Sequence, residues 1–310
     1  MTDSAALPSL VDAGGRVLGY DDEVDVEIGP LAFGCWRFAG ADVATAHELI
    51  ETALDLDMKL IDTADIYGRG HGGSGFGAAE ELLGGVLAAA PELRDRMVLA
   101  TKAGIREGVP YDSSPDYLVA ACDASLERLG VDVIDVFQVH RPDFFTHPLD
   151  VAETLDALVE SGKVRSVGVS NHTPAQVQAL MAYLEAPIVS TQPEYSARDL
   201  RPLRDGTFDL AMEHGHAVLA YSPVGGGALA TGDGVRRELL TVLDELAARE
   251  GVDRSTIAIA FVLCAPSSPV AILGTQKVER LRDAQRALEV HLDRSDCYRI
   301  IEASEGTTLP

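Results

Sequence analysis

The sequence predicts an α/β fold of the (β/α)8 type, the TIM barrel, and three observations support this prediction. Short apolar runs alternate with helical patterns along the 310 residues, as in a parallel sheet with right-handed crossovers. Eight such units over roughly 250–300 residues match the size of a closed barrel. No low-complexity linker or change of composition divides the chain, so we expect one domain over residues 1–310. The alternative is a Rossmann domain joined to a substrate domain.

The predicted elements follow the apolar pattern in order. Residues 1–30 are rich in turns, and the alternating pieces 16–20 and 24–28 predict an N-terminal hairpin that could act as a lid. Strands are predicted at 31–36, 60–62, 97–102, 134–140, 164–170, 188–192, 217–222 and 270–274. Helices are predicted at 43–56, 78–89, 115–129, 149–161, 174–184, 203–214, 235–250 and 255–264, and C-terminal helices at 277–290 and 295–304.

The composition limits the class of protein. A hydrophobic content of 46% with 24% charged residues is typical of a globular protein with a full core. The formal net charge of −24 argues against a nucleic-acid partner or an anionic membrane surface. No apolar run reaches membrane-spanning length, and the N-terminus lacks the features of a secretory signal. The four cysteines have no metal-ligand spacing, so we expect reduced thiols, no metal and a cytoplasmic location.

A glycine-rich segment at 68–73 fits the pattern GxGxxG that binds dinucleotides in Rossmann folds. That fingerprint also requires an acidic residue about 20 residues further on, at the end of the next strand. Here the next predicted strand ends at Lys102 instead. We therefore interpret the segment, which continues to Gly77, as a loop near the substrate pocket.

Four chemically complementary residues fall at or just beyond three successive strand ends, where a barrel builds its active site. Asp62 and Tyr67 follow the second strand, Lys102 ends the third and His140 ends the fourth. A buried lysine needs a partner, and Asp62 could supply it, with the ammonium oriented towards Tyr67. We expect this cation to lower the pKa of the phenol, which could then donate a proton to a carbonyl oxygen. A lone strand-end histidine is more often structural, but four such groups together favour catalysis.

At this point the chain resembles the aldo-keto reductase superfamily, in particular a bacterial oxidoreductase branch with a His-Arg-Pro-Asp segment. The resemblance extends over nearly the whole chain. It rests on Asp-Thr-Ala-x-x-Tyr at 62–67, Lys102, Phe-Gln-Val-His-Arg-Pro at 137–142, Gly-Lys-Val-Arg-x-x-Gly-Val-Ser-Asn at 162–171, Gln192, Ala-Tyr-Ser-Pro-Val-Gly at 220–225 and Ile-Leu-Gly-Thr-x-Lys-Val-x-Arg at 272–280. It implies a catalytic tetrad of Asp62, Tyr67, Lys102 and His140, and a substrate pocket that includes Trp36, Tyr67 and His140.

The resemblance also implies NADP(H) bound without a Rossmann fold, with NAD(H) possible. Ser170, Asn171 and Gln192 would hydrogen-bond the nicotinamide amide, Tyr221 would stack under the ring, and Arg280 would bind the 2′-phosphate. The full set that it assigns to the cofactor is Gly34, Cys35, Trp36, Ser170, Asn171, Gln192, Tyr221, Ser222, Val224, Gly225, Gly274, Thr275, Lys277, Arg280 and Asp283.

Two departures from the family pattern weaken the prediction of NADP over NAD. Gly274 stands where some members have a phosphate-binding lysine, and Ala284 where many have an adenine-side asparagine. Lys277 and Arg280 would have to compensate.

The sequence thus predicts NADPH-dependent reduction of a small aldehyde or ketone to the alcohol, a reversible reaction. The alternatives are an NADPH-binding redox-sensor subunit without efficient turnover and a metal-dependent barrel enzyme. No cluster of metal-ligand residues supports the second alternative. The sequence names neither the substrate nor the oligomeric state.

Overall fold

The computed structural model describes residues 7–19, 25–38 and 40–310. Within this part, parallel strands close into a barrel in the order β10-β3-β4-β5-β6-β7-β8-β9, which confirms the predicted fold class. The barrel strands are β3 (Leu31–Gly34), β4 (Leu60–Asp62), β5 (Val98–Ala103), β6 (Ile134–Val139), β7 (Val164–Ser170), β8 (Ile188–Gln192), β9 (Ala217–Ala220) and β10 (Val270–Leu273).

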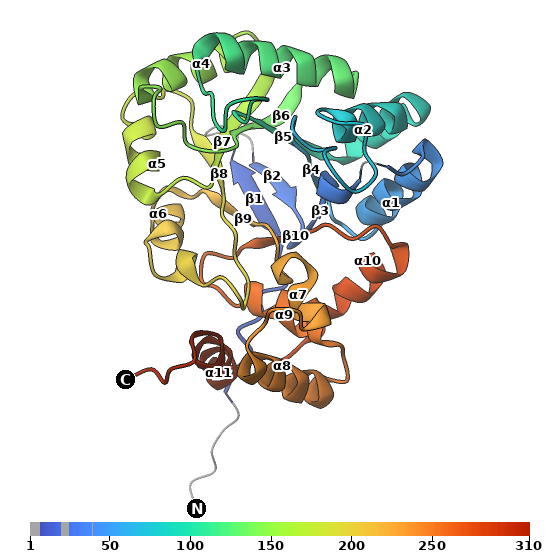
Figure 1. Cartoon of the computed structure of the whole chain (residues 1–310), viewed down its shortest axis with the longest axis vertical. Helices are drawn as coiled ribbons and strands as arrows, with labels where there is room; N and C mark the ends of the chain where they lie inside the picture. The colour runs from blue at the N-terminus through green and yellow to red at the C-terminus, as the bar shows by residue number, and fades with distance from the viewer. Residues whose placement is uncertain (1–6, 20–24, 39) are drawn as a thin grey trace, which may run out of the picture.

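Helices surround the barrel as a ring (Figure 1). Their apolar faces and the outward faces of the strands form one large buried cluster, which is the main core. The α-helices are α1 (Val43–Asp55), α2 (Ala78–Ala89), α3 (Pro115–Leu129), α4 (Pro148–Glu160), α5 (Pro174–Met181), α6 (Thr207–His214), α7 (Ala228–Thr231), α8 (Arg237–Glu250), α9 (Arg254–Val262), α10 (Val278–Ala284) and α11 (Arg294–Glu305). The 3-10 helices are η1 (Cys35–Arg37), η2 (Pro91–Arg96), η3 (Arg201–Leu203), η4 (Gly225–Gly227) and η5 (Gln285–Glu289).

Local sequence signals explain where several helices begin and end. Asp42 caps α1 by accepting a hydrogen bond from the Thr45 amide, 2.8 Å away. A capping box of Thr173 and Gln176 starts α5. Gly130, in the left-handed region with φ 65°, ends α3.

Some predicted boundaries were wrong. The helix predicted at 203–214 begins only at Thr207, because Gly206 adopts φ 87° and separates it from η3. The helix predicted at 277–290 divides into α10 and the 3-10 helix η5. The four-residue helix α7 was not predicted.

The N-terminal hairpin closes the end of the barrel at which the strands begin. Strands β1 (Arg16–Gly19) and β2 (Asp25–Ile28) pair antiparallel, and in Figure 1 they lie at the centre of the ring. Leu18 and Ile28, both fully buried, pack against an apolar layer inside the barrel: Ala32, Leu60, Val98, Ala100, Val136, Val189, Leu219, Val270 and Ile272. Arg16 Nε donates to the carbonyl oxygen of Pro269, just before β10.

The lid prediction for this hairpin is therefore wrong, because its apolar side chains fill the base of the barrel, opposite the strand ends that carry Asp62 and Lys102. Positions 20 and 24 of the two predicted pieces lie outside the described residues.

A glycine sets the register between two barrel strands. The pairing of β7 with β8 shifts between Val167 and Gly168. A Cβ atom at position 168 would lie 2.3 Å from Ser190 Oγ, so only glycine fits this close approach. The shift precedes Ser170 and Gln192, which stand side by side where β7 and β8 end.

Candidate active site

A buried ion pair lies at the C-terminal end of β4 and β5. Lys102 Nζ is 2.7 Å from both carboxylate oxygens of Asp62 and donates a third hydrogen bond, also 2.7 Å, to the carbonyl oxygen of Thr63. Lys102 is fully buried and Asp62 is 3% exposed. Because all three ammonium protons have acceptors, the desolvation cost of burying this cation is offset locally.

Two glutamines complete the environment of the Asp62 carboxylate. Gln192 Nε2, at the end of β8, donates to Asp62 Oδ1 over 2.8 Å. Gln138, in β6, reaches the same oxygen at 3.5 Å. The side-chain amide of Gln192 thus donates a hydrogen bond to the ion pair. From the sequence we expected this amide to bind the nicotinamide, and the contact with Asp62 was not predicted. Gln138 was missed by the sequence analysis, although it lies two residues before His140 on the inward face of its strand.

Tyr67 and His140 lie over this ion pair. Lys102 Nζ is 5.1 Å from the centroid of the Tyr67 ring, within cation–π distance. The rings of Tyr67 and His140 meet edge to face, with centroids 5.9 Å apart and an interplanar angle of 79°. The four predicted tetrad residues are therefore brought together by the barrel, from strand ends up to 78 residues apart in sequence.

Burial is the main influence on the pKa of the Tyr67 hydroxyl and of the His140 imidazole. It raises the pKa of Tyr67 well above that of a free phenol, and the Asp62 carboxylate adds to the increase. The expectation that Lys102 lowers this pKa is wrong, because Asp62 neutralises the ammonium and the phenol is desolvated. Burial, followed by the charges of Lys102 and Arg141, lowers the pKa of His140 well below its ordinary value. Near neutral pH the site presents a protonated phenol beside a neutral imidazole.

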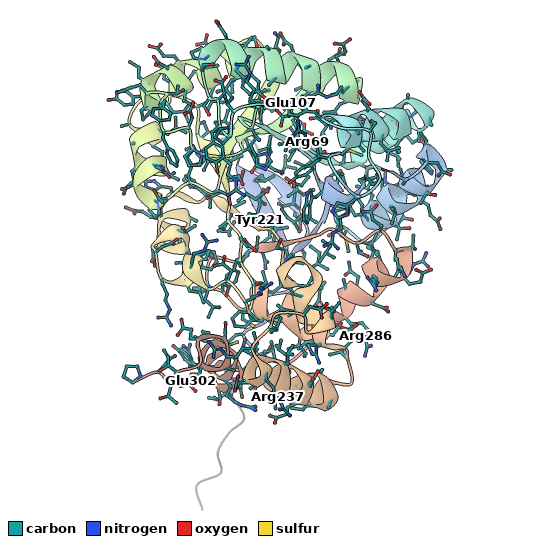
Figure 2. All side chains as sticks on the ribbon, viewed as in Figure 1. Arg69, Glu107, Tyr221, Arg237, Arg286 and Glu302 are labelled. Carbon is teal, nitrogen blue, oxygen red and sulfur yellow. The ribbon has the colours of Figure 1, made fainter. Side chains whose placement is uncertain are left out.

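A hydrogen-bond network joins the neighbouring strand ends. Asn171 adopts a left-handed conformation with φ 59°. Its Nδ2 donates to the His140 carbonyl oxygen at 3.2 Å and to Ser170 Oγ at 2.8 Å. The Tyr221 hydroxyl donates to Asn171 Oδ1 at 2.8 Å. In Figure 2, Tyr221 is labelled near the centre of the ring of helices.

The turn after β9 has the features of an anion-binding loop. Gly225, Gly226 and Gly227 all have positive φ, and a Cβ at position 226 or 227 would meet nothing within 4 Å, so this backbone is open. Arg37 donates from Nη2 to the Gly226 carbonyl oxygen at 2.7 Å. Its Nε is buried and has no hydrogen-bond partner in the described part of the chain. The Arg198 side chain packs against Gly225.

A phosphate-bearing cofactor fits this loop, because an open backbone, the Arg37 guanidinium and the Arg198 side chain lie there. Arg37 and Arg198 were not predicted. Arg37 lies immediately after Trp36 at the end of the first barrel strand, which is the only sequence signal that could have indicated it.

The residues after β10 remain open to solvent on one side. Lys277 and Arg280 are exposed, and Asp283 is exposed on α10. Thr275 Oγ1 accepts a hydrogen bond from the Lys277 amide at 3.3 Å. A Cβ at Gly274 would contact nothing within 4 Å, so the space that a longer side chain would use is present.

The three residues at the end of the first barrel strand differ in exposure. Gly34 is buried, and a Cβ there would lie 2.7 Å from Ile272 Cγ2, so this glycine is required for strand packing. Cys35 is fully buried, and burial raises its pKa. Trp36 is 47% exposed and meets the His71 ring edge to face at 5.2 Å between centroids.

The glycine-rich segment 68–77 bridges two sides of this barrel end. His71 contacts Trp36 on one side, and Arg69 forms an ion pair with Glu107 on the other (Figure 2). It is therefore a loop beside the site, as predicted, rather than the first turn of a Rossmann fold.

Comparison with known proteins agrees with this geometry. The family model "Aldo/keto reductase family" matches residues 30–305, which include the whole barrel. The chain belongs to the aldo/keto reductase family. It is accordingly an oxidoreductase that acts on carbonyl and alcohol groups.

Individual relatives cover nearly the full length of this aldo/keto reductase. A 6-dehydroglucose reductase from Novosphingobium aromaticivorans is 45% identical over 95% of this chain and 97% of its own length. A second, from Agrobacterium fabrum, is 34% identical over 91% of this chain and 96% of its own length. Among solved structures, a glycerol dehydrogenase from Gluconobacter oxydans superimposes with a TM-score of 0.80 at 25% identity, covering 95% of this chain and 98% of its own.

Two further features were examined in the part of this aldo/keto reductase that the structure describes, a metal-ligand cluster and a membrane-spanning helix. Among residues 7–19, 25–38 and 40–310, no group of three or more histidine, cysteine or acidic side chains could hold a metal ion. No helix in these ranges is sufficiently long and apolar to cross a membrane.

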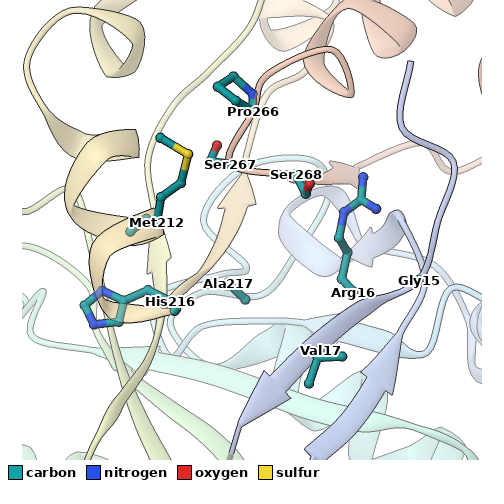
Figure 3. A pocket seen from close by; sticks show the side chains of 11 residues that line it. Gly15, Arg16, Val17, Met212, His216, Ala217, Pro266, Ser267 and Ser268 are labelled. Carbon is teal, nitrogen blue, oxygen red and sulfur yellow. The ribbon is translucent and has the colours of Figure 1, made fainter. Parts of the chain in front are cut away.

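A cavity of about 260 Å³ lies at the opposite end of the barrel, beside the hairpin (Figure 3). Arg16, Met212, His216 and Ser267 line it. None of the four belongs to the strand ends that carry the ion pair, so this cavity is separate from the candidate active site.

Proposed function

We propose that this aldo/keto reductase uses NADPH to reduce an aldehyde or ketone to the alcohol, in a reversible reaction in which Tyr67 donates the proton. When bound, the nicotinamide supplies the hydride to the carbonyl carbon. Tyr67 transfers its phenolic proton to the carbonyl oxygen, and the same proton returns to Tyr67 in alcohol oxidation. The observation that carries the proposal is the Tyr67 ring held between the Lys102 ammonium, 5.1 Å from its centroid, and the His140 imidazole.

Each tetrad residue has a distinct part in this mechanism. The raised pKa of Tyr67 keeps its proton in place until negative charge develops on the carbonyl oxygen. Lys102 then stabilises the phenolate that forms, and Asp62 holds Lys102 in position through two 2.7 Å hydrogen bonds. A neutral His140 can hydrogen-bond the substrate oxygen without adding a charge that would compete with Tyr67 for the proton.

The proposed cofactor site combines an aromatic platform with anion-binding groups. Tyr221 would carry the nicotinamide ring, with Asn171 and Ser170 at its amide. The open turn at Gly225–Gly227, with Arg37 and Arg198 beside it, would bind the pyrophosphate. Arg280 would bind the 2′-phosphate with its planar fork.

The substrate that we propose is a sugar-derived aldehyde. Two relatives that span more than nine tenths of this chain are named 6-dehydroglucose reductases. A small, oxygen-rich aldehyde is compatible with a site formed mainly by polar side chains. One domain over residues 1–310 and a cytoplasmic location stay predictions from the sequence.

The test is optical measurement of NADPH consumption with sugar aldehydes, aromatic aldehydes and α-dicarbonyls, with NADH in parallel. Steady oxidation with NADPH is expected. In an Arg280→Met variant, the KM for NADPH should rise about tenfold, since a charged hydrogen bond contributes about 1.5 kcal/mol or more, while the KM for NADH stays unchanged. Equal use of both cofactors by the parent protein would contradict the Arg280 assignment. Tight NADPH binding without turnover on any carbonyl would instead favour a redox-sensor subunit.

A further inference from the structure

Two aromatic rings, those of Trp36 and His71, form a corner beside the candidate active site. Their centroids are 5.2 Å apart and their planes are inclined by 79°, so one ring is the floor of the corner and the other is its wall. His71 lies four residues after Tyr67, in the glycine-rich segment 68–77. It has no part in the proposed proton transfer, although it is exposed and close to the proton donor in sequence.

The position of Trp36 places this corner between the proton donor and the proposed cofactor turn. Trp36 is two residues beyond Gly34, which pairs with Asp62 where β3 and β4 lie side by side. On another side, the Arg37 guanidinium lies over the Trp36 ring, with its Cζ atom 5.4 Å from the ring centroid. Arg37 Nη2 also donates to the Gly226 carbonyl oxygen at 2.7 Å. A carbonyl compound that reacts between the proton donor and the nicotinamide can therefore extend into the corner.

The segment that carries His71 is held on two sides. A Cβ atom at Gly40, just before α1, would lie 2.6 Å from the His71 carbonyl oxygen, so the two backbones pack closely there. Arg69 forms an ion pair with Glu107 in the loop after β5 (Figure 2). The wall of the corner is thus positioned before a ligand arrives, which lowers the entropy cost of binding.

The backbone at His71 is in a conformation that favours glycine. Its φ is 49°, and its neighbours Gly70 and Gly72 also have positive φ, of 91° and 86°. The Cβ atom of an L-residue crowds the backbone in the left-handed region, so a glycine at position 71 would relieve strain. The contribution of the histidine therefore lies in its ring and not in its backbone.

Both rings of the corner keep surface that a ligand can reach. Trp36 is 47% exposed, and His71 is exposed as well. The imidazoles of His147 and His172 hydrogen-bond backbone groups of their own loops, and no such contact occupies His71 in the part of the chain that the structure describes. A neutral imidazole offers one donor and one acceptor. This combination suits a sugar, which presents C–H bonds on its faces and hydroxyl groups at its rim.

We propose that His71 determines substrate specificity by hydrogen-bonding a hydroxyl group of the substrate remote from the reacting carbonyl, while the Trp36 ring contacts the adjoining carbon atoms. The preferred substrates are then polyhydroxylated aldehydes, and apolar aldehydes of equal length are poorer substrates. This proposal rests on the proposed reductase function and defines the substrate class of the same site. 6-Dehydroglucose, the compound in the names of two relatives, belongs to this class because its pyranose ring carries hydroxyl groups.

The experiment compares two aldehydes of equal chain length on His71→Gly and His71→Asn variants. D-Erythrose carries a hydroxyl group on every carbon beyond the carbonyl, and butyraldehyde carries none. In His71→Gly, kcat/KM for D-erythrose should fall about fivefold, the factor that one neutral hydrogen bond contributes, while butyraldehyde changes less than about twofold. The loss should appear in KM and not in kcat, because the contact is remote from the reacting atoms. His71→Asn should recover part of the loss, since asparagine donates and accepts hydrogen bonds and tolerates a positive φ.

The glycine variant also separates the role of the ring from an effect on folding. Because φ is 49° at this position, His71→Gly should keep the urea midpoint of the parent protein. The matched control is Ser74→Gly, an exposed position of the same segment that gains the same backbone freedom without losing a ring. Its ratio of kcat/KM for the two aldehydes should equal that of the parent. An equal loss on both aldehydes in His71→Gly, or the same shift in Ser74→Gly, would overturn the proposal.

A measurement without turnover separates this proposal from the reductase function. Methyl α-D-glucopyranoside, which has no aldehyde, is titrated into the NADPH complex and followed by the fluorescence of Trp36, the single tryptophan of the chain. Its affinity for His71→Gly should be about fivefold weaker than for the parent. Binding that depends on His71, without reduction of any carbonyl, would contradict the reductase function but support the sugar site. Unchanged affinity in the variant, or no binding to the parent, would overturn the role of His71.

Discussion

The two ends of the barrel are built from the same strands but filled in opposite ways. At the end where the strands begin, Leu60 and Val98 form an apolar layer with Leu18 and Ile28 of the hairpin. Two to four residues further along the same inward faces, side chains are ionic or polar, as at Asp62 and Lys102. The period-2 geometry of a strand allows one face to change from apolar to charged within a few residues.

In the described residues, buried polar atoms without a hydrogen-bond partner are more frequent at the active-site end than at the hairpin end, where Ser267 Oγ is one. Thr63 Oγ1, the Asp65 carboxylate and His140 Nδ1 are all buried near the active-site end without a hydrogen-bond partner in the described ranges. The hairpin end is closed by apolar contacts and by Arg16, which donates to three backbone carbonyl groups. Stability is therefore concentrated at the base and chemistry at the opposite end, so mutations at the two ends should separate stability from activity.

The largest expected effect is that of Tyr67→Phe. Loss of the proton donor should lower kcat by about 10²- to 10⁴-fold, the usual contribution of general acid catalysis. The phenyl ring keeps its contacts with Lys102 and His140, so the affinity for NADPH and the free energy of unfolding should be nearly unchanged. Steady-state kinetics with a fluorescence titration of NADPH test this. Retained turnover would refute the role of Tyr67.

Lys102→Met should lower both the stability and the activity of the protein, because Lys102 belongs to a buried ion pair that lies in the candidate active site. Asp62 would remain buried without its cation, and breaking a buried pair in this way costs about 3–5 kcal/mol of unfolding free energy. Urea denaturation measures the loss, and NADPH consumption measures the expected absence of turnover. The double variant Lys102→Met with Asp62→Asn should regain stability but not activity. A single variant as stable as the parent would show that the ion pair contributes little.

Ile28→Ala tests the opposite end. Truncating this fully buried side chain should lower the free energy of unfolding by about 2–4 kcal/mol through lost burial and a cavity, with kcat unchanged at temperatures where the protein stays folded. The control is Val17→Ala in the same hairpin, where the side chain is 48% exposed and little loss is expected. A fall in kcat for Ile28→Ala would show that the two ends are coupled.

The smallest effect concerns pH. Burial, with a contribution from His214, lowers the pKa of His216 to about 4. The unfolded chain then binds a proton near pH 6.5 that the folded chain does not, so stability falls as pH decreases from about 6.5 towards 4. When the pH falls from 7 to 5, the free energy of unfolding of His216→Gln should decrease by on the order of 1 kcal/mol less than that of the parent protein. His291→Gln, on the surface, is the control, and identical pH dependence of all three proteins would contradict the prediction.

The sequence by itself determined the barrel and the candidates for catalysis. Alternating apolar runs and helical patterns are local signals, and a polar residue at the end of an apolar strand can be read directly, as at Asp62, Lys102 and His140. The same residues carried the family resemblance, which the match over residues 30–305 confirmed.

Only the tertiary structure decided the environments of these residues. The Asp62 carboxylate is completed by Gln192, 130 positions away, and no spacing rule predicts such a contact. The pKa of Tyr67 is raised, whereas the sequence suggested that it would be lowered, because desolvation depends on everything packed around the ring. The hairpin lies at the base of the barrel for the same reason: neighbours in space, rather than along the chain, determine burial and charge.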